Sequence, residues 1–278
     1  MFEHIPELTK EEKEKLESNR KYWGERAAKT QTKLTQKNIS QTEAQLKKYY
    51  KQTMLDTIGQ FESTYNKILL RIEDGKDPTP ADLYKLDTYW QMQGQLRDAL
   101  QKLGDKQAAL LSNQFMSHWY EIYEAVALKD DLFFSEVDSA LANTMINEIW
   151  CADGESWKDR IWKNTALLQQ DLNDGLIECL VTGKTTGDLK HVLQERFNVS
   201  YNRADSLVRT EMAHLQTQAA KQRYKDYGVA EVEILADEDE RRCKICGKLH
   251  KQRFPINGDV PIPAHPKCRC CIVPVIDY

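Results

Sequence analysis

The stretch CKICGKLHKQRFPINGDVPIPAHPKCRCC, residues 243–271, holds five of the chain's seven cysteines together with two histidines and four prolines. Its middle part, residues 247–264, is too polar and too rich in proline to form a hydrophobic core of its own. Cys243 and Cys246 have the spacing at which one tight turn presents two thiolates to a single ion. Because the free energy of metal binding is also folding free energy, a bound ion would give this stretch the rigidity that it otherwise lacks.

The second half of the expected metal site lies in the segment HPKCRC, residues 265–270. Four soft or borderline donors suit Zn²⁺ in a closed tetrahedral site. His265 and Cys268 repeat the two-residue gap of the first pair, whereas Cys270 competes with Cys268 for the last position. The sequence therefore predicts a zinc site formed by Cys243, Cys246, His265 and Cys268, with Cys270 as the substitute. The alternative is that these are free thiols, or thiols oxidised in a mature extracellular particle.

The expected zinc site is structural rather than catalytic. A catalytic zinc keeps an open position for water beside a general base, and the chain has neither H-E-x-x-H nor the H-x-E with P-C-x-x-C of the zinc deaminases. His250 is expected at the surface, and Cys271 is expected to point away from Cys270 because side chains alternate along a strand. Cys151 and Cys179 are expected to be small core residues on helices.

Two strands are expected on either side of the cysteine-rich stretch. Val232 and Ile234 alternate with glutamates, and residues 271–276 are rich in β-branched side chains. Pro274 cannot donate a hydrogen bond to a neighbouring strand, which places its strand at the edge of a sheet. The simplest geometry pairs the two strands and leaves the cysteine-rich loop between them.

Helical periodicity dominates the rest of the chain. Apolar residues recur every three or four positions from Leu46 to Ile72, whereas residues 9–48 show this period only faintly and are expected to fray or to become ordered against a neighbour. Further helices are expected at residues 79–104, 106–128, 135–150, 156–181, 188–197 and 200–227. The predicted fold is mainly α: an elongated helical region, 1–150, followed by a small α+β domain, 151–278, with a zinc-clipped loop between two strands.

The composition is that of a chain with wide polar surfaces made in a reducing compartment. Charged residues make up 29% of the chain and the mean hydropathy is -0.66, so many helices must present polar faces to water or to partners. No segment approaches about 18 uncharged apolar residues, and the first residues resemble no signal peptide. Clustered cysteines in the cytosol are typical of metal ligands rather than of disulfides.

The chain also segregates its charge. Residues 10–51 carry twelve Lys or Arg against six Asp or Glu, residues 52–150 carry eight against sixteen, and residues 241–269 carry eight against one. Such a basic run is either a solvated face or a surface that binds polyphosphate or an acidic partner. The candidate contact residues are Arg241, Arg242, Lys244, Lys248, Lys251, Arg253, Lys267 and Arg269.

A series of short motifs runs through the last part of the chain: Arg209-Thr210-Glu211, Tyr227-Gly228-Val229, Asp239 and Arg241 before Cys243-x-x-Cys246, then Pro263 to Cys270, and Val273-Pro274-Val275. In this order they resemble the phage head-morphogenesis family, the Mu F-type minor head proteins, over residues 156–278. The helical front, with SWKDRIW at residues 156–162, is similar to minor capsid proteins of tailed phages that infect Gram-positive hosts. Cys271 departs from the family pattern, in which an aliphatic or polar residue usually follows the last cysteine.

The resemblance implies a low-copy virion protein that is associated with the portal and enclosed in the head. Its partners would be the portal protein, with the major capsid or scaffolding protein and packaged double-stranded DNA as further candidates. The chain would occupy the host cytoplasm during assembly and the head interior near the portal vertex afterwards. The family also implies an influence on head assembly and DNA packaging or delivery, with DNA bound without sequence preference in some members.

Three functions are compatible with these observations. The first is a structural and interaction protein without enzymatic activity, whose basic end meets DNA or acidic protein through salt-dependent contacts. The second is a metal-dependent nuclease in which the cysteines brace a catalytic His250. The third is a sequence-specific DNA-binding zinc module, which is disfavoured because the four prolines within residues 255–266 leave no helix to enter a groove.

Overall fold

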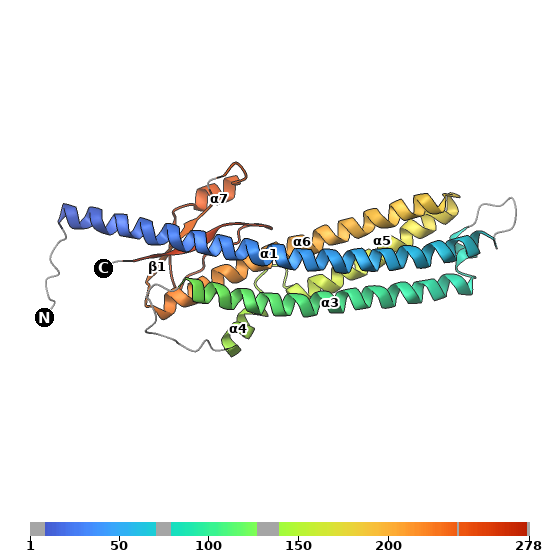
Figure 1. Ribbon diagram of the computed structural model, residues 1–278, viewed down its shortest axis with the longest axis horizontal. Helices are drawn as coiled ribbons and strands as arrows, with labels where there is room; N and C mark the ends of the chain where they lie inside the picture. Colours follow the sequence, from blue (N-terminus) through green and yellow to red (C-terminus); the bar gives the residue numbers. More distant parts are fainter. Residues whose placement is uncertain (1–8, 71–78, 127–138, 238, 277–278) are drawn as a thin grey trace. The chain divides into compact units, whose positions relative to one another are not determined.

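A computed structural model describes residues 9–70, 79–126, 139–237 and 239–276 of the chain (Figure 1). Its elements are α1 (Lys10–Leu69), α2 (Pro80–Leu83), α3 (Asp87–Ala125), α4 (Ser139–Ile146), α5 (Trp157–Val181), α6 (Thr186–Asp226), β1 (Glu231–Leu235), α7 (Lys244–Leu249), β2 (Arg253–Pro255) and β3 (Cys271–Val275). The prediction of a mainly α protein with a small sheet near its C-terminus is confirmed. Within the described ranges, every helix is too short or too polar to cross a bilayer.

Three helices are longer than the sequence predicts. α1 continues without a break through the faintly periodic residues 10–48. The helix expected at residues 79–104 is interrupted at residues 84–86, between α2 and α3, and its second part runs on past Gly104 as α3. A single helix, α6, replaces the two expected at 188–197 and 200–227. Gly104 is a contact residue rather than a helix stop, because a Cβ atom there would overlap the indole ring of Trp162. A glycine under a large ring permits close packing and need not end a helix.

The start of α5 forms as its sequence predicts. Ser156 precedes the helix in an extended conformation, and its Oγ accepts a hydrogen bond from the backbone N–H of Asp159 at 3.2 Å. The Asp159 carboxylate in turn accepts from the backbone N–H of Ser156 at 2.9 Å. This reciprocal capping satisfies two backbone donors that the first turn of a helix leaves free.

The sheet has three antiparallel strands in the order β2-β1-β3. Val232 of β1 lies opposite Phe254 of β2 and opposite Pro274 of β3, so the predicted pairing of the two longer strands and the edge position of Pro274 are confirmed. β2 was not predicted, because three residues are too few to show an alternating pattern. α1 covers β3: a Cβ atom at Gly24 would lie 3.6 Å from the Val273 side chain.

The chain divides into two compact units, each assembled from separated segments. Unit 1 comprises residues 1–39, 115–146 and 209–278, and unit 2 comprises residues 40–114 and 147–208. Both units therefore take part of α1, α3 and α6. The division predicted from the sequence, at residue 150, is continuous along the chain and stays a prediction.

Unit 2 has an apolar core formed by helices alone. Side chains of α1, α3, α5 and α6 form one buried cluster that includes Phe61, Tyr65, Leu96, Leu172 and Phe197. Burying a side chain of this size contributes about 1.5–3 kcal/mol relative to leaving it exposed. Hydrophobic burial is therefore the main stabilising force of this unit.

Unit 1 combines the sheet with a buried seam of polar side chains. The inward face of α1 presents Gln31, Thr35 and Asn38, all of them buried. Gln31 donates through Nε2 to the Ile272 carbonyl of β3 at 2.8 Å, and Thr35 donates to Oε1 of Gln216 at 2.5 Å. These hydrogen bonds set the position of α1 on its neighbours, because a shifted register would leave buried polar groups unpaired.

Candidate metal centre

Cys243 and Cys246 meet at the start of α7. Cys243 is the N-cap residue of this helix, and its Sγ accepts a hydrogen bond from the backbone N–H of Cys246 at 3.3 Å. The first turn of α7 therefore holds the two sulfur atoms on one side. The same turn leaves Cys243 half-buried and Cys246 buried.

The other half of the centre is a turn that begins at His265. The Nδ1–H of His265 donates to the Pro266 carbonyl at 2.8 Å, and the backbone N–H of Cys268 donates to the His265 carbonyl at 3.2 Å. Lys267 has a φ of 60°, and its backbone N–H is tied to Oγ1 of Thr210 at 3.1 Å. Because Nδ1 carries the proton, the lone pair of the other ring nitrogen, Nε2, is available to an ion.

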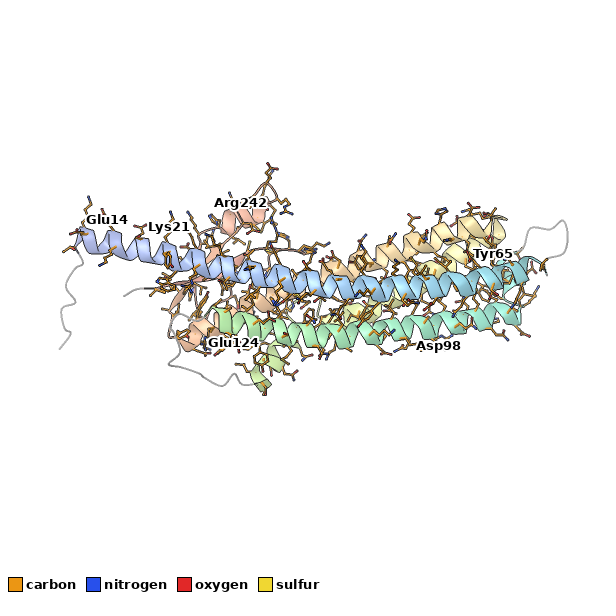
Figure 2. The ribbon with its side chains drawn as sticks, in the orientation of Figure 1. Glu14, Lys21, Tyr65, Asp98, Glu124 and Arg242 are labelled. Atoms are coloured by element: carbon orange, nitrogen blue, oxygen red, sulfur yellow. The ribbon has the colours of Figure 1, made fainter. Side chains whose placement is uncertain are left out.

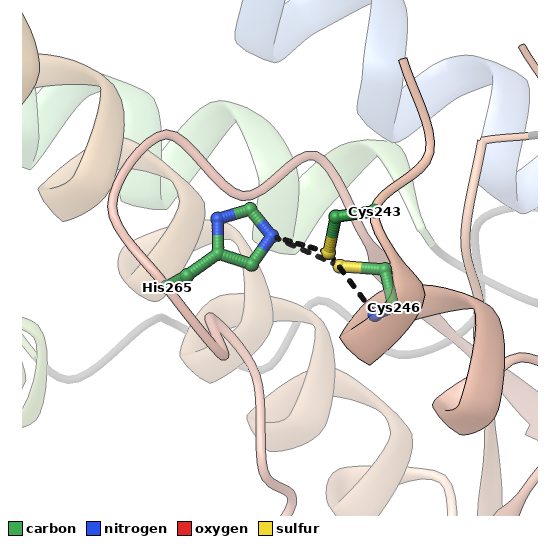
Figure 3. A group of neighbouring side chains, drawn as sticks. All are labelled: Cys243, Cys246 and His265. Atoms are coloured by element: carbon green, nitrogen blue, oxygen red, sulfur yellow. Dashed lines mark hydrogen bonds between the residues drawn. The ribbon is translucent and has the colours of Figure 1, made fainter. Parts of the chain in front are cut away.

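The five predicted donors form two close groups that share Cys246: one with Cys243 and His265, the other with Cys268 and Cys270. Nε2 of His265 is 3.3 Å from Sγ of Cys243 and 3.1 Å from Sγ of Cys246, and Figure 3 shows the ring aimed at both sulfurs. Sγ of Cys246 is 3.8 Å from Sγ of Cys268, and Cys246, Cys268 and Cys270 form a second close group. Ligands of one tetrahedral zinc are separated by about 3.8 Å for two sulfurs and about 3.5 Å for sulfur and nitrogen. The cluster could therefore hold a metal ion.

The thiols of the cluster differ in how readily they ionise. The backbone N–H of Cys246 lowers the pKa of Cys243, and a hydrogen bond from the Cys270 thiol lowers the pKa of Cys268 to about 5. Burial raises the pKa of Cys246 to about 12, and the hydrogen bond to Cys268 raises the pKa of Cys270. Negative charge is thus favoured on Cys243 and Cys268, one sulfur from each half of the centre.

Ion pairs that the sequence analysis did not predict support the centre from outside. The guanidinium of Arg269 makes a two-pronged contact with Asp239 at 2.7 and 2.6 Å and lies 2.9 Å from Asp237. Arg269 thereby holds the pKa of Asp239 well below its usual range. The contact joins the loop after β1 to the residues before β3. In the sequence, these ion pairs are indicated only by two aspartates, Asp237 and Asp239, that lie just before a run rich in Lys and Arg.

The eight candidate contact residues fall into two groups. Arg241 pairs with Asp239 at 3.1 Å, Arg253 pairs with Glu233 at 3.3 Å, and Arg269 is bound as described. Lys267 is exposed, with its backbone held by the turn. The remaining four are exposed and have no carboxylate partner among the described residues: Arg242, Lys244, Lys248 and Lys251.

Other residues singled out from the sequence lie outside the cluster. His250 accepts a hydrogen bond through Nδ1 from the backbone N–H of Ala236 at 3.2 Å and is only partly exposed, so it braces the end of α7. Cys271 is buried, and burial raises its pKa to about 12. Cys179 belongs to the core of unit 2, as predicted, whereas Cys151 is half-buried in a turn and not on a helix.

Comparison with known proteins places the centre in a family context. Residues 170–273 match the family profile described as Phage Mu protein F like protein. The matched segment runs from within α5 to β3 and contains all five candidate ligands. No curated protein matches the chain, and no solved structure matches it. The match confirms, over residues 170–273, the resemblance seen in the sequence motifs.

Proposed function

We propose, on the premise of the match over residues 170–273, that this chain is a portal-associated minor head protein of a tailed phage. It acts in procapsid assembly and in DNA packaging or delivery, inside the head near the portal vertex. Its main partner is the portal protein, with the major capsid or scaffolding protein and packaged duplex DNA as further partners. The observation that carries this proposal is the family match, which includes both the long helix α6 and the Cys/His cluster.

The proposed cofactor is one structural Zn²⁺ held by Cys243, Cys246, His265 and Cys268. The donor set is that of a closed tetrahedral site, in which no position remains for a reacting water. Cys268 is preferred to Cys270 as the fourth ligand because the backbone N–H and the thiol of Cys270 both donate to its sulfur. Such donors stabilise a thiolate, which is the form that binds metal.

Metal analysis of purified, reduced protein tests the zinc assignment. We expect one zinc per chain by inductively coupled plasma mass spectrometry. Cys246→Ser and Cys268→Ser should weaken zinc binding by at least a hundredfold in a competition with a chromogenic chelator. Cys270→Ser should weaken it by less than tenfold, and Cys151→Ser is the matched control outside the cluster. Stoichiometric zinc in Cys268→Ser with loss in Cys270→Ser would exchange the two assignments, and absence of any transition metal would refute the site.

Co-expression with the portal protein of the same phage tests the assembly role. A minor head protein should co-elute with the portal ring in size-exclusion chromatography and should be recovered in procapsids. A groove of about 910 Å³ between α1 and α3 within unit 2 offers one surface for such contacts. Separate elution, together with absence from procapsids, would contradict the proposal.

The proposal includes sequence-independent contact of the chain with duplex DNA and no cleavage of it. Phosphate contacts are independent of sequence and weaken steeply with added salt. Anisotropy titrations with two unrelated 30-bp duplexes should therefore give equal affinities that fall together between low and physiological salt. A nuclease would need an accessible catalytic histidine, whereas Nδ1 of His250 accepts the Ala236 N–H. Cleavage in Mg²⁺ or Mn²⁺ that His250→Ala abolishes would overturn this part.

A further inference from the structure

We infer that α7 and its flanking cations form a docking surface for the acidic, partly apolar face of another head protein, with Ile245 as the anchor. This surface, the α7 knob, comprises Arg242, Lys244, Ile245, Lys248 and Lys251. The inference rests on the proposed function, because it takes the partner to be a protein of the same phage head. It adds the chemistry of that partner and the residues that meet it.

Ile245 is an exposed apolar side chain on α7. Its side chain is 54% exposed, although it lies in the first turn of α7, which Cys243 caps. Lys248 lies one turn further along the same face of α7, and Lys244 is adjacent in sequence. Figure 2 labels Arg242 beside the same helix, and the residue is exposed. The knob is thus an apolar point surrounded by cations.

The backbone of the α7 knob is held by contacts at both ends. Cys243 caps the first turn, and Nε2 of His265 contacts the sulfurs beneath it. At the other end, the backbone N–H of Lys251 donates to the Ile234 carbonyl at 2.7 Å, and His250 is tied to Ala236. A surface whose backbone is already fixed loses little conformational freedom when a partner binds.

The cations of the α7 knob differ in their ion pairing from the arginines nearby. Arg253 and Arg269 are already neutralised by Glu233, Asp237 and Asp239, whereas the cations of the knob have no carboxylate partner among the described residues. Their field attracts an acidic surface and accelerates encounter with it. Lys244 and Lys248 therefore place unmatched positive charge on the same short helix that exposes Ile245.

The exposed isoleucine favours a protein partner over DNA. A phosphate backbone takes up cations and polar donors and offers no apolar pocket to an isoleucine that projects from a helix. In protein interfaces, by contrast, an apolar anchor enters a dry pocket while charged residues form the rim. Ile245 at the centre of the knob fits the second arrangement.

Site-specific photo-crosslinking in phage-producing cells tests the inference. Ile245 is replaced by p-benzoylphenylalanine in the full-length, zinc-containing chain, and the cells make the portal and major capsid proteins of the same phage. Irradiation should give an adduct with a head protein, and mass spectrometry should place the adduct on a peptide rich in Asp and Glu. The charge reversal Lys244→Glu/Lys248→Glu should lower the adduct yield at least tenfold.

The matched control is Lys29→Glu/Lys33→Glu on α1, which makes the same change of charge at the same spacing on exposed residues of unit 1. It should leave the adduct yield within twofold. Adducts with DNA, adducts with neutral peptides, or a yield that the α7 reversal leaves unchanged would overturn the inference. Normal recovery of the chain in heads without any adduct at position 245 would overturn it while the proposed function stands. Absence of the chain from heads would instead refute the proposed function.

Discussion

In unit 2 the buried face of α1 carries Ile58, Phe61 and Tyr65, whereas in unit 1 the same helix turns Gln31, Thr35 and Asn38 inward. Both sets recur every three or four residues, so each draws one stripe along the helix. The first stripe packs into an apolar cluster, and the second makes hydrogen bonds to β3, α3 and α6.

The contrast shows two ways of fixing one helix. Apolar burial contributes free energy in proportion to area and tolerates small displacements. Buried hydrogen bonds contribute only about 1 kcal/mol each, but a displaced partner leaves an unsatisfied group that costs more. Unit 1 therefore adds to its buried apolar side chains a set of hydrogen bonds that specifies the position of α1.

Loss of the proposed metal should give the largest difference in hydrogen-exchange protection between the two units. A structural zinc contributes about 10–16 kcal/mol in small zinc domains, so Cys246→Ser should remove most of the hydrogen-exchange protection of β1 amides. The amides of residues 92–100 in unit 2 should keep theirs. Cys151→Ser serves as the control. Unchanged protection of β1 in the zinc-free protein would show that unit 1 does not depend on the ion.

Truncation of the apolar stripe should act on unit 2 in the opposite way. Phe61 is completely buried, and Phe61→Ala should lower the free energy of unfolding by about 3–5 kcal/mol. The metal content of the chain should not change. Leu55→Ala, on the same helix with a side chain that is 49% exposed, should change stability by about 0.5 kcal/mol or less. Urea denaturation measures both, and equal effects would contradict the assigned core.

Acid should weaken the polar seam through His118. Nδ1 of this buried ring accepts from Asn38 at 3.1 Å, Nε2–H donates to the Met212 carbonyl at 3.0 Å, and Glu121 is the nearby charge. Burial lowers the pKa of His118 to about 4. Between pH 6.5 and 4 the ring is therefore neutral in the folded chain and protonated in the unfolded chain. Stability should be constant above pH 6.5 and fall by about 3 kcal/mol between pH 6.5 and 4.

The contribution of His118 is isolated by His118→Gln, in which the amide can keep both hydrogen bonds. Urea midpoints between pH 7.5 and 4.5 should fall less steeply for the variant than for the wild type. Metal release and carboxylate titration affect both proteins equally, so the difference between the two profiles reports the histidine. Parallel profiles would mean that the pKa of His118 is the same in the folded and the unfolded chain.

The smallest expected effects concern two glycines of α3 in unit 2. Gly104→Ala places a Cβ atom against Trp162 and should destabilise by about 1–3 kcal/mol. Gly94→Ala meets no atom within 4 Å and should stabilise by about 1 kcal/mol, because alanine favours a helix. Thermal melting of both variants checks the contrast. Effects of the same sign would show that Trp162 moves aside freely.

The sequence was most informative where local chemistry determines structure. The capping box at Ser156, the alternation at Val232 and Ile234, and the paired spacings of the cysteines with His265 each depend on residues close together in the chain. These features predicted the start of α5 and the two strands, and the set of zinc ligands that the spacings indicate stays a prediction.

Sequence reasoning failed where the deciding contact is distant. The continuity of α3 depends on Trp162, 58 positions after Gly104, and the order of the first half of α1 depends on partners in α6 and β3. A stripe of glutamine, threonine and asparagine has no hydrophobic period, so its burial left no signal. The clamp between Arg269 and Asp239 was hidden for the same reason, because thirty positions separate its partners.

The hydrogen bond from Gln31 to Ile272 can form only after the ribosome has synthesised both residues. Its two residues are 241 positions apart, so at about 5–20 residues per second the ribosome releases the second roughly 10–50 s after the first. Until then the nascent helix has no strand to cover. An inward face of amides and hydroxyls stays hydrated during this wait, whereas an apolar one would invite aggregation of unfinished chains.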